Sequence, residues 1–445
     1  MNNYKLTAVA VALFAGLTAF GQKSPVVEGA CKSAEMMEVF YNTYPEAKLR
    51  HDELEKFTKE YVESHINDQS KTTRSSKYII PCVFHVYGTP QGGKDVNLAI
   101  LQEALDKWAN IDFKGKNSDY GMVHTKFLSI RDTLDITFVI AKLDPQGKPT
   151  TGIVTHPVAS GYGGSGKDAQ IKADGWDNYS YLNFYIMNDI YGNGSLVNSG
   201  STTPPGADAS LGLARCVFNG AMIGRNSGNS EFGSVITHEL GHFFNLMHTF
   251  KDGVACKDLN GVDPDGVADT PITDYGFTTP APGCHPSATA TTPVNCKNEL
   301  INVENYMDYA GASACYRMFT KGQVLRMKAG LEDPSRKNLW QTANLIKTGV
   351  KSGTLSINQE ANKFTAVVYP NPSNAIFNLD LSTSKQEIFN ITVMDVIGNT
   401  VFSLKTGLVT GELVTPMDLS SLSKGVYFLS VKGNESQNII KVVKQ

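Results

Sequence analysis

The chain has 445 residues, 40 basic and 43 acidic side chains, and a formal net charge of −3. This length predicts two or three domains, and the near balance of charge argues against a nucleic-acid scaffold or a polybasic membrane binder. Frequent glycine, asparagine and threonine favour a loop-rich extracellular protein, in which some of the seven cysteines form disulfides.

The N-terminal region has the pattern of two removable segments. Residues 1–21 resemble a secretory signal peptide, with Lys5 before a short apolar run and small residues at its end. A membrane anchor is the alternative, but the run is too short to span a bilayer comfortably. Residues 22–76 are polar and helix-prone, and the basic patch Lys71–Lys77 predicts a protease-accessible joint. We therefore expect a propeptide over 22–76. The mature form should have no transmembrane segment and should be exported through the periplasm, then secreted or held at the cell surface.

Strands and one long helix are expected before the central motif. The β-branched and aromatic content of Tyr78–Tyr87 predicts a strand, as do the patterns of Leu134–Leu143 and Tyr181–Met187. Apolar side chains on one face of Val96–Phe113 predict an amphipathic helix. Irregular chain dominates after the motif, and this layout predicts a two-lobed α+β domain with a metal between the lobes.

The central motif, over residues 237–250, reads T-H-E-L-G-H-F-F-N-L-M-H-T-F. His238 and His242 share one helix face, and His248 follows six residues later. Three imidazoles and a water form the open site of a catalytic zinc, and Glu239 is placed to take the proton of that water. A core helix with hydrogen-bonded histidines is the alternative, but each buried imidazole would then need its own partner.

Asn245 departs from the long form of this motif, H-E-x-x-H-x-x-G-x-x-H, which has glycine there. The glycine allows the left-handed backbone conformation that ends the helix, and asparagine is the next residue to tolerate it. We therefore expect the chain to turn at Asn245 and to bring His248 back to the metal.

Two further motifs follow the histidines. Asp263, Asp265 and Asp269 surround a glycine turn, and the sequence leaves open whether they bind calcium or form an Asx-rich turn. The run N-Y-M-D-Y that ends at Tyr309 has the form of a Met-turn, which would place Met307 beneath the zinc histidines. A closing helix is predicted from Phe319 to Glu332.

The composition changes after residue 340. Residues 341–364 have the glycine, serine, lysine and asparagine content of a linker. Short alternating runs over residues 365–445 predict a small all-β antiparallel sandwich.

The segment from about Lys77 to Arg336 resembles the pappalysin family of metzincin metallopeptidases, in the zinc motif, D-G-V-A-D-T-P, N-Y-M-D-Y and the late cysteines. The resemblance implies a catalytic domain over residues 77–340, with a twisted mixed sheet, helices and a loop-rich C-terminal lobe. It also implies a secreted zinc endopeptidase that acts on proteins or peptides.

The resemblance also implies roles for single residues. Glu239 becomes the general base, and Tyr309 becomes a side chain that swings onto the metal or the oxyanion. The implied ligands are His238, His242 and His248 for zinc, and Asp265, Asp269 and Thr270 for calcium. The implied disulfides are Cys256–Cys296 and Cys284–Cys315, although the sequence alone permits three pairings of these four cysteines. Relatives that prefer basic residues have an acid where this chain has Ala314, which argues against a strict arginine preference.

The propeptide resembles the family in C-x-x-x-x-M-M-E-V-F from Cys31. This implies that the Cys31 thiolate occupies the water position on zinc and keeps a zymogen silent. An incidental unpaired cysteine is the alternative.

The tail resembles the C-terminal sorting domain of type IX secretion in Bacteroidota. This resemblance implies that the type IX secretion machinery is a partner. The resemblance lies in four segments: Tyr369–Pro372, Asp395–Gly398, Met417–Ser420 and Lys424–Tyr427. An adhesive or carbohydrate-binding module is the alternative for the tail.

The alternatives for the whole chain are a surface adhesin or binding protein with a non-catalytic metal site, and a zinc hydrolase of another bond. The intact Glu239 favours an enzyme, since a structural site needs no base. The Met-turn and the propeptide favour proteolysis.

Overall fold

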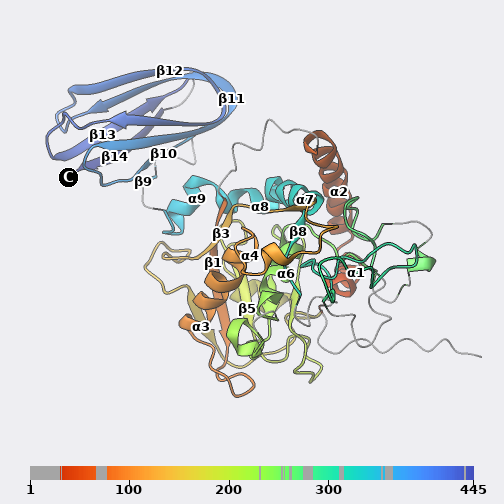
Figure 1. The fold of residues 1–445 in the computed structure, drawn as a ribbon. Helices are drawn as coiled ribbons and strands as arrows, with labels where there is room; N and C mark the ends of the chain where they lie inside the picture. The colour runs from red at the N-terminus through yellow and green to blue at the C-terminus, as the bar shows by residue number, and fades with distance from the viewer. Residues whose placement is uncertain are drawn as a thin grey trace, which may run out of the picture.

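The computed structural model describes residues 31, 33–66, 78–229, 232–251, 254, 256–259, 263–273, 284–309, 315–351, 354–355, 364–434 and 437–445 (Figure 1). The predicted signal peptide, the predicted joint at 71–77 and Ala314 lie outside these residues. Among the described helices, none is both long and apolar enough to cross a membrane.

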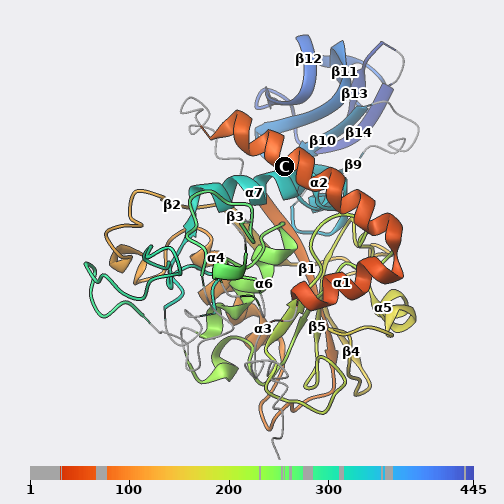
Figure 2. The same ribbon diagram turned by 90° about the vertical axis from the view of Figure 1, so that its right-hand side faces the viewer.

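Two helices form the N-terminal region, which confirms its predicted helical character. Helix α1 covers Ser33–Thr43 and helix α2 covers Pro45–His65. Pro45 stands in the first turn of α2, where its missing N–H costs no hydrogen bond. Figure 2 shows both helices on one side of the central domain, with α2 running beside α7.

A mixed sheet forms the first lobe, in the order β3-β1-β5-β7-β6, with β4 also paired to β1. All its pairings are parallel except that of β6 with β7. The central strand β1 is buried almost throughout, as expected for a parallel strand covered on both faces. The bounds are β1 Tyr78–Tyr87, β3 Ile136–Ile140, β4 Ile153–His156, β5 Leu182–Ile186, β6 Gly200–Thr202 and β7 Cys216–Phe218.

The predicted helix over Val96–Phe113 is one helical stretch with a π-helical turn inside it. It consists of α3 Leu98–Ala104, the π turn Leu105–Ala109 and α4 Asn110–Asp112. Asn97 caps its start by accepting a hydrogen bond from the Ile100 amide. This stretch packs against helix α6, Val235–Phe243, which carries His238 and His242.

The second lobe contains helix α7, Lys321–Glu332, and long irregular segments. Its helix starts two residues later than predicted, because Thr320 is the N-cap and forms a capping box with Gln323.

The remaining short elements of the chain are η3 Tyr120–Met122, β2 Arg131–Asp132, α5 Asp168–Asp174, η4 Gly224–Ser227, η5 Phe232–Ser234, η6 Cys256–Asp258, β8 Phe319–Thr320, α8 Pro334–Lys337, η8 Asn338–Trp340, α9 Thr342–Lys347 and β9 Thr354–Leu355.

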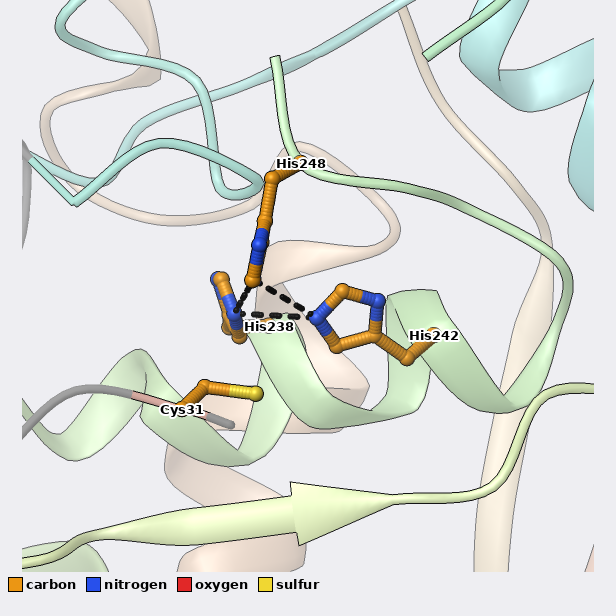
Figure 3. Close-up of side chains that lie close together, drawn as sticks. All are labelled: Cys31, His238, His242 and His248. Atoms are coloured by element: carbon orange, nitrogen blue, oxygen red, sulfur yellow. Dashed lines mark hydrogen bonds between the residues drawn. The ribbon is translucent and has the colours of Figure 1, made fainter. Parts of the chain in front are cut away.

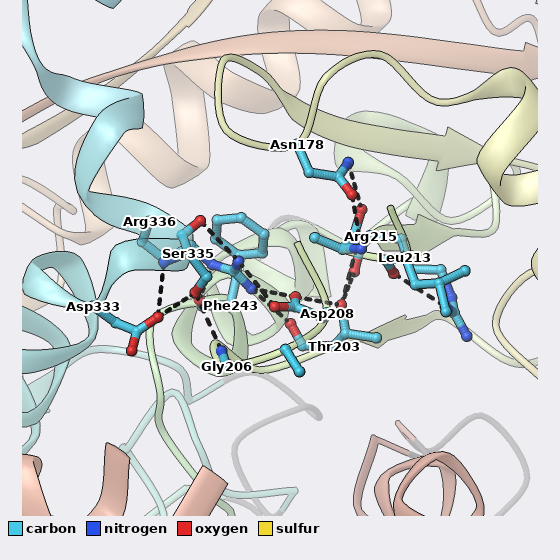
Figure 4. A network of polar contacts seen from close by, with 12 residues as sticks. Asn178, Thr203, Gly206, Asp208, Leu213, Arg215, Phe243, Asp333, Ser335 and Arg336 are labelled. Atoms are coloured by element: carbon cyan, nitrogen blue, oxygen red, sulfur yellow. Dashed lines mark hydrogen bonds and ion pairs between the residues drawn. The ribbon is translucent and has the colours of Figure 1, made fainter. Parts of the chain in front are cut away.

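Arg336 ties the end of this domain to helix α6 and to the loop between β6 and β7 (Figure 4). Its buried guanidinium donates to the carbonyls of Phe243 and Thr203 and forms an ion pair with Asp208 at 2.6 Å. The same group lies 3.8 Å from the centre of the Phe243 ring. One side chain thus joins the last turn of α6 to the loop that connects β6 with β7.

The tail is an all-β antiparallel domain, which confirms the prediction. Its layers belong to one sheet, β14-β13-β11-β10-β9 with β12 on β11, which curves around its own apolar core. The sheet nearly closes, because the Asn438 amide donates to the Phe364 carbonyl and the Val443 N–H donates to Asn371. The bounds are β10 Phe364–Tyr369, β11 Ile376–Met394, β12 Thr400–Asp418, β13 Gly425–Lys432 and β14 Gln437–Lys444.

Candidate metal centre

Helix α6 ends where the sequence predicted a turn. Asn245 has φ +79°. The Leu246 N–H donates to the Gly241 carbonyl, and the Asn245 N–H donates to the His242 carbonyl. These two bonds are the pair that closes a helix through a left-handed residue. The chain then reverses and brings His248 back beside α6.

The three histidines converge on one point (Figure 3). Their Nε2 atoms lie 3.2 Å apart between His238 and His242, 3.0 Å between His242 and His248, and 3.3 Å between His248 and His238. Nitrogen ligands placed 2.0–2.1 Å from one zinc in a tetrahedral arrangement are separated by about 3.3 Å. The arrangement therefore fits a zinc ion.

Hydrogen bonds on the far side of the rings set their orientation. The Nδ1 atom of His238 lies 2.6 Å from the Tyr306 carbonyl, and that of His242 lies 2.8 Å from the Leu246 carbonyl. A carbonyl accepts, so each Nδ1 carries the proton and each Nε2 presents a lone pair. Burial lowers the pKa of His238 to about 3 and that of His242 well below its usual value, which keeps both rings neutral, as a metal ligand must be.

Glu239 is fully buried beside this cluster. Neither carboxylate oxygen accepts a well-formed hydrogen bond from the described residues. Burial raises the pKa of Glu239 to about 7, and the nearby Cys31, Thr202 and Ser33 lower it in part. Strand β6 closes one side, since a Cβ on Gly200 would lie 2.6 Å from a Glu239 oxygen. A buried carboxyl with little support from its surroundings is suited to exchange protons.

The N-terminal segment enters the same site. The Sγ of Cys31 and the ligand nitrogens of His238, His242 and His248 all lie within 4.8 Å of one another. The Thr202 N–H of β6 donates to the Ser33 hydroxyl at 3.0 Å, and the Tyr309 hydroxyl donates to the Cys31 carbonyl. Burial and the adjacent Glu239 raise the pKa of the Cys31 thiol. A thiolate here therefore needs a cation beside it.

The predicted Met-turn lies under α6. The side chain of Met307 is fully buried and its sulfur faces Gly241. The turn is held to the chain after the third histidine, because the Thr249 hydroxyl donates to Asp308 at 2.9 Å and the Thr249 N–H donates to the Met307 carbonyl. The Met-turn residue and the histidines are thus brought together.

The carboxylates of the Asp-rich loop bond within their own loop and to the start of α7. The Asp265 carboxylate accepts from the Val267 N–H and the Thr270 hydroxyl, whereas Asp269 accepts from Thr320 and Gly322 at the start of α7. The two carboxylates thus have protein donors in different places, and a calcium site here stays a prediction. The structure contains the disulfides Cys256–Cys296 and Cys284–Cys315, and Cys82 and Cys216 are buried thiols.

The sequence reasoning missed Asp112, a buried acid behind α6. It accepts a hydrogen bond from the hydroxyl of Thr237, the residue before His238, at 2.7 Å. Burial raises the pKa of Asp112 to about 7, while Thr237, Ser234 and Tyr306 lower it in part. The signal available in the sequence was an acid on the apolar stretch I-D-F, next to the π turn.

Comparisons with known proteins agree with this geometry. Residues 165–332 match the profile of the pregnancy-associated plasma protein-A family, and residues 367–445 match that of a secretion system C-terminal sorting domain. An extracellular metalloprotease of Colletotrichum graminicola is 32% identical over 154 residues, which are 34% of this chain and 48% of that protein. One of Arthroderma benhamiae is 31% identical over 172 residues, 38% of this chain and 53% of that protein.

The chain spans about half the length of the curated relatives it matches. Among solved structures, a mutant of Tannerella forsythia promirolysin is similar with a TM-score of 0.52 at 25% identity, covering 71% of this chain and 98% of that one.

Proposed function

Residues 165–332 belong to the pregnancy-associated plasma protein-A, or pappalysin, family of metallopeptidases, and on that premise we propose that the chain is a secreted zinc endopeptidase made in a latent form. One observation carries the proposal: the Nε2 atoms of three histidines converge within 3.3 Å beside a buried carboxyl that has no hydrogen-bond partner among the described residues. A structural metal site has no use for that carboxyl.

His238, His242 and His248 would hold the zinc, which when bound supplies Lewis acidity that lowers the pKa of water and polarises a carbonyl. Glu239 takes a proton from the attacking water at a carboxylate oxygen and returns it to the leaving amine. Tyr309 is proposed to turn its hydroxyl, now on the Cys31 carbonyl, to the oxyanion once the prosegment leaves.

The latent form rests on Cys31. Its thiolate would complete the ligand set and exclude the nucleophilic water, while Ser33 occupies the Thr202 N–H of β6. The similarity to a promirolysin structure supports a precursor of this kind. Protein or peptide chains are the proposed substrates of the processed form.

The tail belongs to a secretion sorting family and directs the proposed route. We expect recognition by type IX secretion machinery, passage through the periplasm, and release or attachment at the cell surface. An exported enzyme after deletion of residues 365–445 would argue against this role.

The test compares cleavage of denatured casein by the processed enzyme with that by Glu239→Gln, with chelator and with zinc restored. The Glu239→Gln variant should cleave casein more slowly than the parent by a factor of roughly 10²–10⁴. It should bind as much zinc as the parent, as measured by elemental analysis. Lys337→Met, a change in a surface ion pair, should keep full activity. Cleavage that persists in Glu239→Gln, or that ignores the chelator, would overturn the mechanism.

A further inference from the structure

Helix α2 of the prosegment packs on the second lobe, away from Cys31. Its side chains Leu54 and Thr58 are buried, with 3% and 1% of their surface exposed, against α7. The neighbouring charged side chains of Lys59 and Glu63 are exposed. The helix therefore has one face fitted to the catalytic domain and one face in solvent.

The contact reaches the turn that follows the zinc helix. The Asn245 side-chain amide donates to the Thr58 hydroxyl at 3.0 Å, and both residues are buried. Arg326 of α7 donates from Nε to the Asn245 carbonyl at 2.6 Å and forms an ion pair through Nη2 with Glu55 of α2. Arg326 keeps 6% of its side chain exposed and Glu55 keeps 34%, so only the guanidinium side of this pair is shielded from water.

This contact gives a reason for the departure from the motif. A glycine at position 245 would adopt the positive φ with less strain, but it has no amide to donate. Asparagine keeps the turn and adds a donor that meets Thr58. The side chain that replaces the glycine thus bonds the prosegment and not the metal centre.

Helix α1 holds the other lobe. Phe40 of α1 packs among apolar side chains that include Tyr185 of β5 and Tyr162 of the loop after β4, and the hydroxyl of Tyr44, the residue after α1, donates to Asp168 at 2.5 Å. The prosegment therefore contacts both lobes as well as the site between them.

From these contacts we propose that the surface formed by Asn245, Arg326 and α7 is a docking surface for helix α2. It anchors the prosegment independently of Cys31, so a cut behind α2 leaves the segment bound and the enzyme inhibited until α2 dissociates. This inference rests on the proposed latent form. The occupant of the docking surface is helix α2 of this same chain, which presents the Thr58 hydroxyl to Asn245 and the Glu55 carboxylate to Arg326.

The direct test follows backbone amide exchange of α2 by mass spectrometry in the full chain with Glu239→Gln, which prevents self-cleavage. Asn245→Gly and Thr58→Val should each speed exchange of α2 by about three- to tenfold, with β1 unchanged as a reference. Cys31→Ser should leave α2 exchange unaltered. The matched control Glu63→Gln changes an exposed acid of the same helix and should have no effect.

Unaltered α2 exchange in both Asn245→Gly and Thr58→Val would overturn the anchor, as would α2 release by Cys31→Ser alone. Should Asn245→Gly also speed exchange of β1, Thr58→Val decides the matter, since it changes the prosegment only. In the active chain, Thr58→Val should shorten the lag before casein cleavage with an identical final rate, because the processed enzyme has the same sequence. The exchange result holds or fails whether or not the chain cleaves peptides.

Discussion

The backbone of Gly241 lies against the sulfur of Met307, so closely that a Cβ built on Gly241 would stand 2.5 Å from that sulfur. The glycine lies between the two helix histidines, one residue before His242. Only a residue without a side chain lets the Met-turn approach α6 to this distance. The relationship links the spacing of the histidine motif to a turn more than sixty residues later.

We predict that Gly241→Ala destabilises the domain by about 1–3 kcal/mol, the usual cost of an extra group in a packed interior. It should also weaken zinc binding, because the methionine must move from beneath the ligands. Urea unfolding and competition with a zinc chelator measure the two effects. Gly121→Ala is the control, since its Cβ would meet nothing within 4 Å. Equal stability of the two variants would contradict this account.

Replacement of Cys31 by alanine should make the precursor active before it is processed. Without the thiol, the full chain should cleave a short quenched peptide at least about tenfold faster than the parent precursor. Ser33→Ala, which removes only the contact to the Thr202 N–H, should have a smaller effect. A Cys31→Ala precursor as latent as its parent would show that Cys31 is an incidental thiol.

Asp112 should make stability depend on pH in an unusual direction. Its pKa is about 7 in the folded protein and near 3.8 when unfolded. Between these values the folded state keeps a proton that the unfolded state has released, so the free energy of unfolding falls as pH rises. Above about pH 7 this loss is complete, and it is on the order of 4 kcal/mol for a shift of this size.

The measurement is urea unfolding of the parent and of Asp112→Asn at pH 5 and pH 8. The amide does not titrate, so the variant should lose less stability than the parent over this range. Comparing the two proteins removes the contribution of other titrating groups. If the free energy of unfolding changed by the same amount between pH 5 and pH 8 in the parent and in Asp112→Asn, the pKa of Asp112 would be near its ordinary value.

Arg336→Met should cost about 3–5 kcal/mol, because it leaves Asp208 buried without its partner. The double variant Arg336→Met with Asp208→Asn should lose less free energy of unfolding than the sum of the losses in the two single variants. Lys337→Met is the matched control, since its ion pair with Glu332 is exposed and contributes less than about 1 kcal/mol. Additive losses in the double-variant cycle would mean that the pair does not interact as described.

The sequence predicted what depends on local spacing. Histidines four residues apart must share a helix face, and Asn245 tolerates the turn that returns His248, so the clustering of the three imidazoles followed from residues 237–250. The strands β1, β3 and β5 were also predicted, since apolar β-branched runs are characteristic of buried parallel strands.

What depends on distant pairing was out of reach. Strand β6 has three residues, too few for any periodicity to register, yet it lies against Glu239. Asp112 meets Thr237 across 125 residues, and Thr58 meets Asn245 across 187. No local pattern marks such contacts, because each depends on how whole elements pack.

The place of Arg336 in the chain has a consequence for synthesis. The guanidinium joins Phe243, Thr203 and Asp208 from 93 to 133 residues downstream of them. A ribosome completes all the histidines and the glutamate long before it adds this arginine. The nascent polypeptide therefore contains the histidine cluster and Glu239 for some time before Arg336 can fix α6 to the neighbouring loop, and the candidate site reaches its final form only after that.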